Sequence, residues 1–304
     1  MLRLLGLALG GCLAVTSTVQ AGERYRVGHG LVFTNDIIGD GNDRWRTGSV
    51  ASSHVYAPGW DGAAPARLGE MLELRFNGEI IAPEDISTPA PGDRPYAGAL
   101  SLGLHSHVTR GRMEYALGGD LVVTGSQTGL DDFQGFLHDI VGNDNMSAGV
   151  RRNQVGNEVH PTGVIEAGRS FTLGPVRLRP FAEARAGVET LVRAGADLTL
   201  GGLTQGELMV REPVTGQRYR AVRADVSGYA IVLGADITYV EDSKFLPGRS
   251  GVQIEETRTR VRGGLHWEGR GGGSVFYGVT YLGEEFKSQR EGQVVGSLQF
   301  RLRF

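Results

Sequence analysis

The last stretch of the chain, "GSLQFRLRF" at residues 296–304, alternates between apolar and polar side chains. In a β-strand, successive side chains point to opposite faces, so every second residue shares a face. One face would carry only apolar side chains, from Leu298, Phe300, Leu302 and Phe304. A strand that crosses a membrane needs about 9–11 residues, apolar towards lipid and polar towards the lumen. The stretch is therefore typical of a membrane-spanning barrel strand.

Many other segments show the same period of two, among them residues 96–106, 175–188, 231–239 and 274–283. We count about eleven to thirteen candidate strands, and bacterial barrels have even strand numbers, so we predict an all-β, antiparallel transmembrane barrel of about twelve strands. A soluble β-sandwich also alternates. The strand length of about ten residues and the terminal phenylalanine, which is typical of outer-membrane barrels, favour the barrel.

The amino terminus predicts export. Arg3 precedes an apolar run from Leu4 to about Val15, and Val19-Gln20-Ala21 forms a small-residue cleavage pattern. We predict a signal peptide over residues 1–21 and a single outer-membrane barrel over residues 22–304. The only cysteine of the chain, Cys12, lies in the signal, so the mature protein has no disulfide and no thiolate chemistry.

Composition narrows the function classes. The formal net charge is -3, which provides no bulk basic surface, and we expect no nucleic-acid partner. Glycine is common, 48 of 304 residues, and is scattered as in curved sheets. Beyond the signal peptide no run approaches the roughly 18 apolar residues of a transmembrane helix. We expect a monomer in the bacterial outer membrane.

One segment, "DDFQGFLHDIVGND" at residues 131–144, has helical spacing instead. Its apolar residues recur at i, i+3, i+4, i+7 and i+8, namely Phe133, Phe136, Leu137, Ile140 and Val141. We expect this stripe to pack against some other surface, Asp131 or Asp132 to cap the start and Gly142 to end the helix. Gln134 and His138 lie four residues apart on another face, so their side chains would be neighbours.

Three polar motifs accompany this helix in the first half of the chain. "FTNDIIGDGNDRWRTG" at residues 33–48 places Asn35 and Asp36 at a strand end and Thr47 at the start of the next strand. "PGDRPYAG" at 91–98 is a rigid loop, and "RNQVGNE" at 152–158 follows the helix. A histidine alone would be incidental, but a structural barrel needs none of these motifs.

Together, the motifs resemble those of the outer-membrane lipid A 3'-O-deacylase family, over about residues 30–160. The resemblance implies a twelve-stranded barrel that is a calcium-dependent esterase, with its site between the barrel wall and the helix and facing the outer leaflet. The substrate would be lipopolysaccharide, from whose lipid A the 3'-linked acyloxyacyl chain is removed.

The resemblance also implies residue roles. His138 would be the general base, Asn35, Thr47 and Gln134 would belong to the catalytic site, and Asp36 would be a calcium ligand. A second metal ligand is expected at Asp144, six residues after the histidine, where active members carry a glutamate.

One position departs from the family pattern. Active members have a lysine directly before the Gly-Asp-Arg of the "PGDRPYAG" motif, and this chain has Pro91 there. If that lysine binds a substrate phosphate or the oxyanion, another cation has to replace it, and Arg44, Arg46 and Arg94 are the candidates.

Ester chemistry agrees with these residue types. Histidine suits proton abstraction near neutral pH, and calcium prefers carboxylate and amide oxygens. Two alternatives compete with this function. An outer-membrane phospholipase would carry an "H-x-S-N-G" motif, but His138 is followed by Asp-Ile-Val. The other alternative is a catalytically silent barrel that binds lipopolysaccharide or forms a narrow pore.

Overall fold

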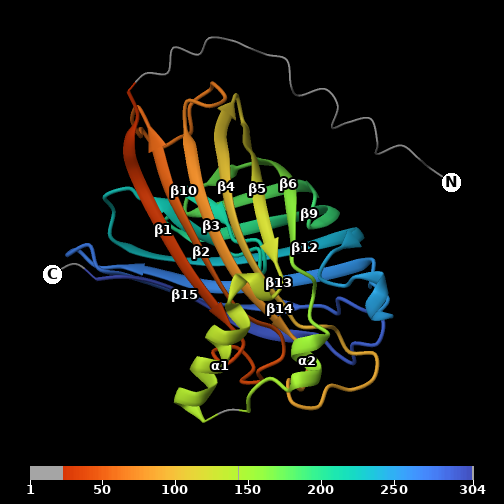
Figure 1. The fold of residues 1–304 in the computed structure, drawn as a ribbon. Coiled ribbons are helices and arrows are strands. Elements are labelled where there is room, and N and C mark those ends of the chain that lie inside the picture. The colour runs from red at the N-terminus through yellow and green to blue at the C-terminus, as the bar shows by residue number, and fades with distance from the viewer. Residues whose placement is uncertain (1–22, 143, 303–304) are drawn as a thin grey trace, which may run out of the picture.

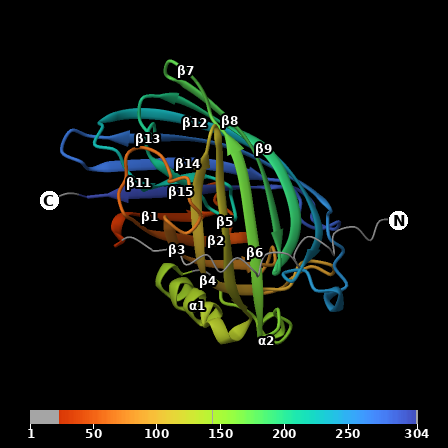
Figure 2. The same ribbon diagram turned by 90° about the horizontal axis from the view of Figure 1, so that it is seen from above.

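The protein is a closed antiparallel β-barrel in a computed structural model that describes residues 23–142 and 144–302 (Figures 1 and 2). The predicted signal peptide and the terminal Phe304 lie outside the described residues. Among the residues that the structure describes, no helix has the length and apolar character needed to cross a membrane.

Twelve strands form the barrel wall. In chain order they are β1 Tyr25–Asn35, β2 Trp45–Ala57, β3 Leu72–Ala82, β4 Ala97–Arg110, β5 Met113–Thr124, β6 Glu158–Arg169, β8 Val176–Ala186, β9 Glu189–Gly201, β12 Gly228–Ser243, β13 Thr257–Glu268, β14 Ser274–Leu282 and β15 Gln293–Arg301. Each pairs with its neighbour, β1 pairs with β15, and β6 pairs with β8 to close the ring. A three-residue strand, β7 Phe171–Leu173, only extends the sheet beside β8. The predicted fold class and strand number are confirmed.

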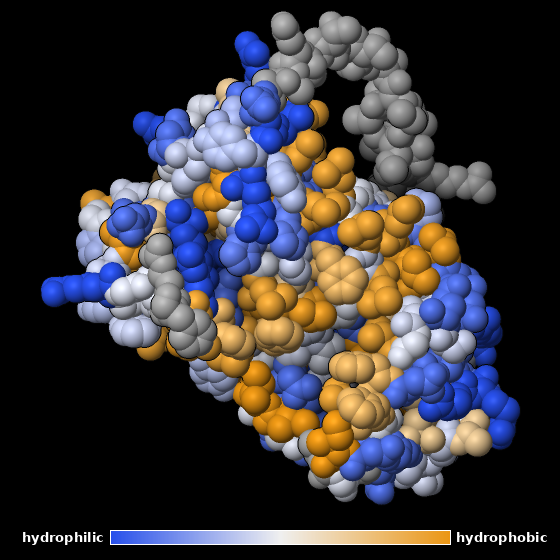
Figure 3. Space-filling view, turned by 60° about the vertical axis from the view of Figure 1, so that its left-hand side comes forward, coloured by the Kyte–Doolittle hydropathy of each residue, from blue (hydrophilic) through white to orange (hydrophobic). Residues whose placement is uncertain are grey.

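The two faces of the wall follow the predicted alternation. On β8, Leu178 is 44% exposed, whereas Arg179 and Glu183 are buried towards the lumen. On β15, Phe300 is exposed and Gln299 is buried. Apolar side chains gather over the outer face between more hydrophilic ends (Figure 3). Lipid favours apolar side chains outside, while the charged side chains inside pair with one another.

The barrel encloses a hairpin that the sequence analysis did not foresee. Strands β10 Leu208–Arg211 and β11 Arg218–Val222 pair only with each other and lie against β1. Their apolar side chains share a core cluster with Val32, Ala51 and Val55 of the wall. Their charged side chains pair with wall residues, as Arg211 does with Glu166 at 2.7 Å. The hairpin therefore fills part of the lumen.

Glycines on β1 permit this close packing. A Cβ at Gly30 would lie 2.6 Å from the carbonyl oxygen of Arg220 and 2.9 Å from the Tyr219 ring. We expect Gly30→Ala to lower the free energy of unfolding by about 1–3 kcal/mol, because the hairpin must move away. Gly163→Ala is the matched control, since a Cβ there meets no atom within 4 Å. Heat denaturation in detergent measures both, and equal losses would contradict tight packing at Gly30.

The helices lie at one end of the barrel (Figure 1). They belong to the connection between β5 and β6: α1 spans Leu130–Val141 and α2 spans Ala148–Arg152, after the short 3₁₀ helix η1 Ser126–Thr128. A second 3₁₀ helix, η2 Gly248–Ser250, lies between β12 and β13. β1 ends and β15 begins at this end, so the described chain termini lie at the other end. Outer-membrane barrels have longer extracellular loops, which assigns the helical end to the outside.

Candidate functional site

Glycines, not carboxylates, set the ends of α1. Gly129 precedes the helix in the left-handed conformation, and no side chain caps the first turn, so the predicted cap by Asp131 or Asp132 was wrong. The predicted end at Gly142 is confirmed: its φ is 80°, and its N–H donates to the carbonyl of His138 at 2.8 Å. A residue without Cβ adopts that conformation at least cost.

The apolar face of α1 points away from the protein. Phe133 is 50%, Phe136 61% and Ile140 65% exposed. The periodicity identified an apolar face, but it did not identify what that face contacts. In a membrane protein an outward apolar face meets lipid, so this orientation is consistent with the position of α1 at the outer leaflet.

The opposite face of α1 carries the predicted pair. Gln134 and His138 are 3% and 6% exposed, and Gln134 Nε2 lies 3.3 Å from His138 Nε2. His138 Nδ1 lies 2.6 Å from the main-chain carbonyl of Asp144, and Nε2 lies 2.9 Å from Asp43 Oδ2. A carbonyl only accepts hydrogen bonds, so Nδ1 carries a proton. Nε2 is the nitrogen that faces the site.

The connection between β1 and β2 forms the other side of the site. Asn35 Nδ2 and the N–H of Asp36 both donate to the carbonyl of Thr47, at 2.8 and 3.2 Å. Thr47 Oγ1 donates to Asp43 Oδ1 at 3.1 Å. These bonds hold the loop of residues 36–44 against the start of β2. The five predicted positions Asn35, Asp36, Thr47, Gln134 and His138 are therefore joined, through Asp43, into one polar site.

The surroundings of Asp36 show whether this residue fits the role of a calcium ligand. It is 0% exposed, Oδ2 accepts from the N–H of Arg44 at 2.8 Å, and Oδ1 has no hydrogen-bond partner among the described residues. Burial raises the pKa of Asp36 to about 8, the Arg44 N–H opposes this, and the charge of Asp43 adds to it. A buried carboxylate with a free oxygen beside a second carboxylate fits a divalent cation.

The ligand set for such a cation would need oxygens besides carboxylates. Within the described residues, no group of three or more His, Cys, Asp or Glu side chains is arranged to hold a metal. Calcium accepts backbone and amide carbonyls, which loop 36–44 offers. The Asp144 side chain is exposed and only its carbonyl is placed at His138, so its role as a ligand stays a prediction.

Asp43 is the site residue that sequence reasoning missed. It was part of the quoted motif, but no role was assigned to it. Its carboxylate joins Thr47 on the strand to His138 on the helix, two segments that are far apart in the chain. The Asp-Arg pair next to Thr-Gly was the available signal. The contact itself depends on the docking of α1.

The motif after the helix positions α1. Asp131, 3% exposed, accepts from Arg151 Nη1 at 2.9 Å and from Gln154 Nε2 at 3.2 Å. Asn157 Oδ1 accepts from the N–H of Gln127 just before the helix, at 3.1 Å. The "RNQVGNE" segment, together with Arg151 just before it, thus holds the first turn of α1.

The "PGDRPYAG" loop lies against the barrel mouth. Arg94 is buried and pairs with Glu285, and Arg46 pairs with the same carboxylate at 2.8 Å. Arg44 pairs with Glu291 at 2.6 Å, although its main-chain N–H binds Asp36. All three arginines that could replace the family lysine thus pair with carboxylates. Of the three, only Arg44 contacts the site, through its main-chain N–H to Asp36.

Comparisons with known proteins identify a family for this chain. A family model described as outer membrane protein LpxR matches residues 5–304. The solved structure of LpxR from Salmonella typhimurium aligns with a TM-score of 0.74 at 18% identity, over 91% of this chain and 100% of that chain. The β domain of the Bordetella autotransporter BrkA aligns with a TM-score of 0.42 at 11% identity, over 91% and 100%. No curated protein sequence matches the chain.

The match of the family model over nearly the whole chain confirms the resemblance inferred from the motifs. With the barrel fold, it also confirms the bacterial outer membrane as the location. The chain belongs to the LpxR family of outer membrane proteins, the family of lipid A 3'-O-deacylases.

Proposed function

We propose that this barrel is a calcium-dependent esterase that acts as a monomer and removes the 3'-linked acyloxyacyl chain of lipid A. The observation that carries the proposal is the arrangement of His138. Its ring is buried, Nδ1 is held by a carbonyl, and Nε2 points at a site that holds two carboxylates. A structural histidine has no need of a buried carboxylate with a free oxygen next to it.

His138 acts as the general base through Nε2. The Asp144 carbonyl holds the proton on Nδ1, so the lone pair of the neutral ring is on Nε2. A water molecule attacks the ester carbonyl carbon and gives its proton to Nε2. The resulting imidazolium has Asp43 Oδ2 at 2.9 Å, which stabilises the positive charge. Gln134 Nε2 lies 3.3 Å from the same nitrogen, so its side chain helps to keep the ring in place.

The attack forms a tetrahedral intermediate whose oxygen carries the negative charge. When it collapses, the bond between the carbonyl carbon and the sugar 3'-oxygen breaks. The imidazolium of His138 returns its proton to that oxygen, which leaves a sugar hydroxyl and a free acyloxyacyl acid. His138 is then neutral again. One residue therefore serves both proton transfers.

Calcium would be held by Asp36 through its free oxygen, together with carbonyl oxygens of loop 36–44. When bound, it supplies positive charge that polarises the ester carbonyl and stabilises the oxyanion. Asn35 and Thr47 maintain the loop that presents Asp36.

The outward face of α1 supports a substrate in the membrane. Phe136 and Ile140 are exposed on the same helix that buries His138 towards the wall. An apolar helix face at the leaflet surface binds acyl chains by removing apolar area from water, about 25 cal/mol per Å². The substrate ester can thus approach the site while its chains stay in an apolar environment.

The pore alternative is disfavoured by the filled lumen. The β10–β11 hairpin packs against β1, and its Arg211 pairs with Glu166 of the wall. A silent barrel that binds lipopolysaccharide would keep this fold without needing the buried site of His138 and Asp36.

Mass spectrometry of lipid A from cells that express the protein tests the proposal. We expect the loss of one 3' acyloxyacyl unit with calcium present and unchanged lipid A in membranes treated with a chelator. Unchanged lipid A in both conditions, from a barrel that migrates as folded, would contradict the deacylase function. Loss of a different acyl chain would support esterase activity but contradict specificity for the 3' position.

A further inference from the structure

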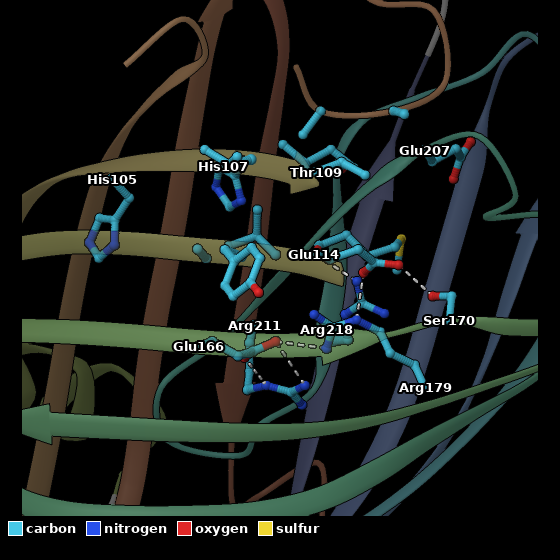
Figure 4. Close-up of a pocket in the computed structure, with 18 of the residues that line it drawn as sticks. His105, His107, Thr109, Glu114, Glu166, Ser170, Arg179, Glu207, Arg211 and Arg218 are labelled. Atoms are coloured by element: carbon cyan, nitrogen blue, oxygen red, sulfur yellow. Dashed lines mark hydrogen bonds and ion pairs between the residues drawn. The ribbon is translucent and has the colours of Figure 1, made fainter. Parts of the chain in front are cut away.

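A polar cavity, drawn in Figure 4, is lined by residues beside the β4–β5 turn, and so lies at the end of the barrel opposite to His138. It has a volume of about 330 Å³ and lies between the wall strands β4, β5, β6 and β8 and the β10–β11 hairpin. The loop before β3 borders it, and Trp60 Nε1 of that loop donates to the carbonyl of Gly206 at 3.0 Å. By the orientation above, this end faces the periplasm.

The cavity has an excess of positive side chains. Four glutamates line it, namely Glu114, Glu166, Glu183 and Glu207. Six arginines line it, namely Arg75, Arg177, Arg179, Arg185, Arg211 and Arg218. Two of these arginines pair with carboxylates just outside the lining, Arg75 with Glu73 at 2.7 Å and Arg211 with Asp197 at 2.8 Å. An uncompensated charge inside a barrel is costly, so it has to bind water or an anion.

Four of the six arginines pair with wall carboxylates, namely Arg75, Arg179, Arg185 and Arg211. Arg179 pairs with Glu114 at 2.6 Å and with Glu166 at 2.7 Å, and Arg211 pairs with Glu166 at 2.7 Å. Glu114 also accepts from Ser170 Oγ at 2.5 Å. These ion pairs fix the positions of the guanidinium groups on one side of the cavity.

Arg177 and Arg218 have no carboxylate within ion-pair distance among residues 23–142 and 144–302. Arg177 on β8 donates only to Thr204 Oγ1, at 3.0 Å, and Arg218 on β11 donates only to the carbonyl of Met209, at 3.1 Å, within this part of the chain. Each guanidinium has five N–H donors, so most of them remain free. Both side chains are half-buried, and both line the cavity.

We propose that this cavity binds a soluble phosphate group, as inorganic phosphate or a small phosphate monoester, between Arg177 of the wall and Arg218 of the hairpin. A phosphate carries up to two negative charges, which matches the two guanidinium groups without a carboxylate partner, and arginine binds phosphate oxygens with paired N–H groups. The wall strands separate the cavity from lipid, so the ligand comes from the periplasm. The bound anion links the hairpin to the wall.

Titration of the purified wild-type barrel with inorganic phosphate, in neutral detergent without calcium, tests the site by calorimetry. We expect saturable binding of one phosphate. Arg177→Gln and Arg218→Gln should each raise the dissociation constant by about 10- to 100-fold, because each removes a charge-assisted contact. Arg218→Lys keeps the positive charge but loses the paired N–H groups of the guanidinium. It should raise the dissociation constant less than Arg218→Gln does. Arg249→Gln, in the extracellular η2 segment, is the control and should bind as the wild type does.

Absence of saturable phosphate binding to the wild type would overturn the proposal. So would unchanged binding in a folded Arg177→Gln, Arg218→Gln double variant, since phosphate would then be held elsewhere. The wild-type titration decides the first point even if the double variant fails to fold. Lipid A deacylation should be unchanged in the single variants, because the cavity and His138 lie at opposite ends, so failure here is distinct from failure of the esterase.

Discussion

Alanine in place of His138 is expected to lower the rate of lipid A deacylation by about 10²- to 10⁴-fold, the usual contribution of a general base. The ring would be lost from the site, while Asp36 and its loop would remain held by Thr47. The first-order rate of loss of the 3' acyloxyacyl unit, followed by mass spectrometry on detergent-solubilised enzyme, measures the effect.

A second histidine provides the control for this experiment. His54 lies on β2 and stacks on His29, with ring centroids 6.4 Å apart, away from α1. His54→Ala should retain the wild-type rate. Calcium should still bind to His138→Ala, because His138 is not among the proposed ligands. A rate within about threefold of the wild type in His138→Ala would reject the histidine as the base.

The barrel could be predicted because lipid imposes a simple rule on every strand. Leu178 and Phe300 have to face outwards and Arg179 and Gln299 inwards, so a period of two appears in the sequence and is confirmed. In the β10–β11 hairpin, "RYRAV" alternates in the same way over its first four residues, whereas "LMVR" has three apolar residues in a row. Nothing in that pattern tells a wall strand from a strand inside the lumen, and the hairpin was therefore missed.

The site could be predicted only in part for a similar reason. Helical spacing placed Gln134 beside His138, because that relation is local. The contact of His138 with Asp43 joins distant segments and depends on how α1 docks, which is set by Asp131 with Arg151 and Gln154. Periodicity also found the apolar stripe of α1, but it could not say whether protein or lipid covers it.

The calcium ligand leads to the last prediction. Asp36→Asn keeps the shape of the side chain and removes its charge, so calcium affinity should fall by about 100-fold or more, as expected when a first ligand is lost. Calorimetric titration with calcium measures this without using activity. Asp61→Asn, exposed in the loop after β2, is the control and should bind calcium as the wild type does.

The same substitution should have the opposite effect on the calcium-free barrel. Burial raises the pKa of Asp36 to about 8 in the fold, above its ordinary value of 3.8. The folded state therefore keeps a proton that the unfolded state releases, and the stability from this carboxyl decreases as pH rises from about 4 to about 8. Above pH 8 the buried carboxylate is charged, so Asp36→Asn should raise the calcium-free melting temperature there. Weaker calcium binding together with a more stable calcium-free barrel would identify Asp36 as a residue kept for the ion, because a structural carboxylate would destabilise the fold when neutralised.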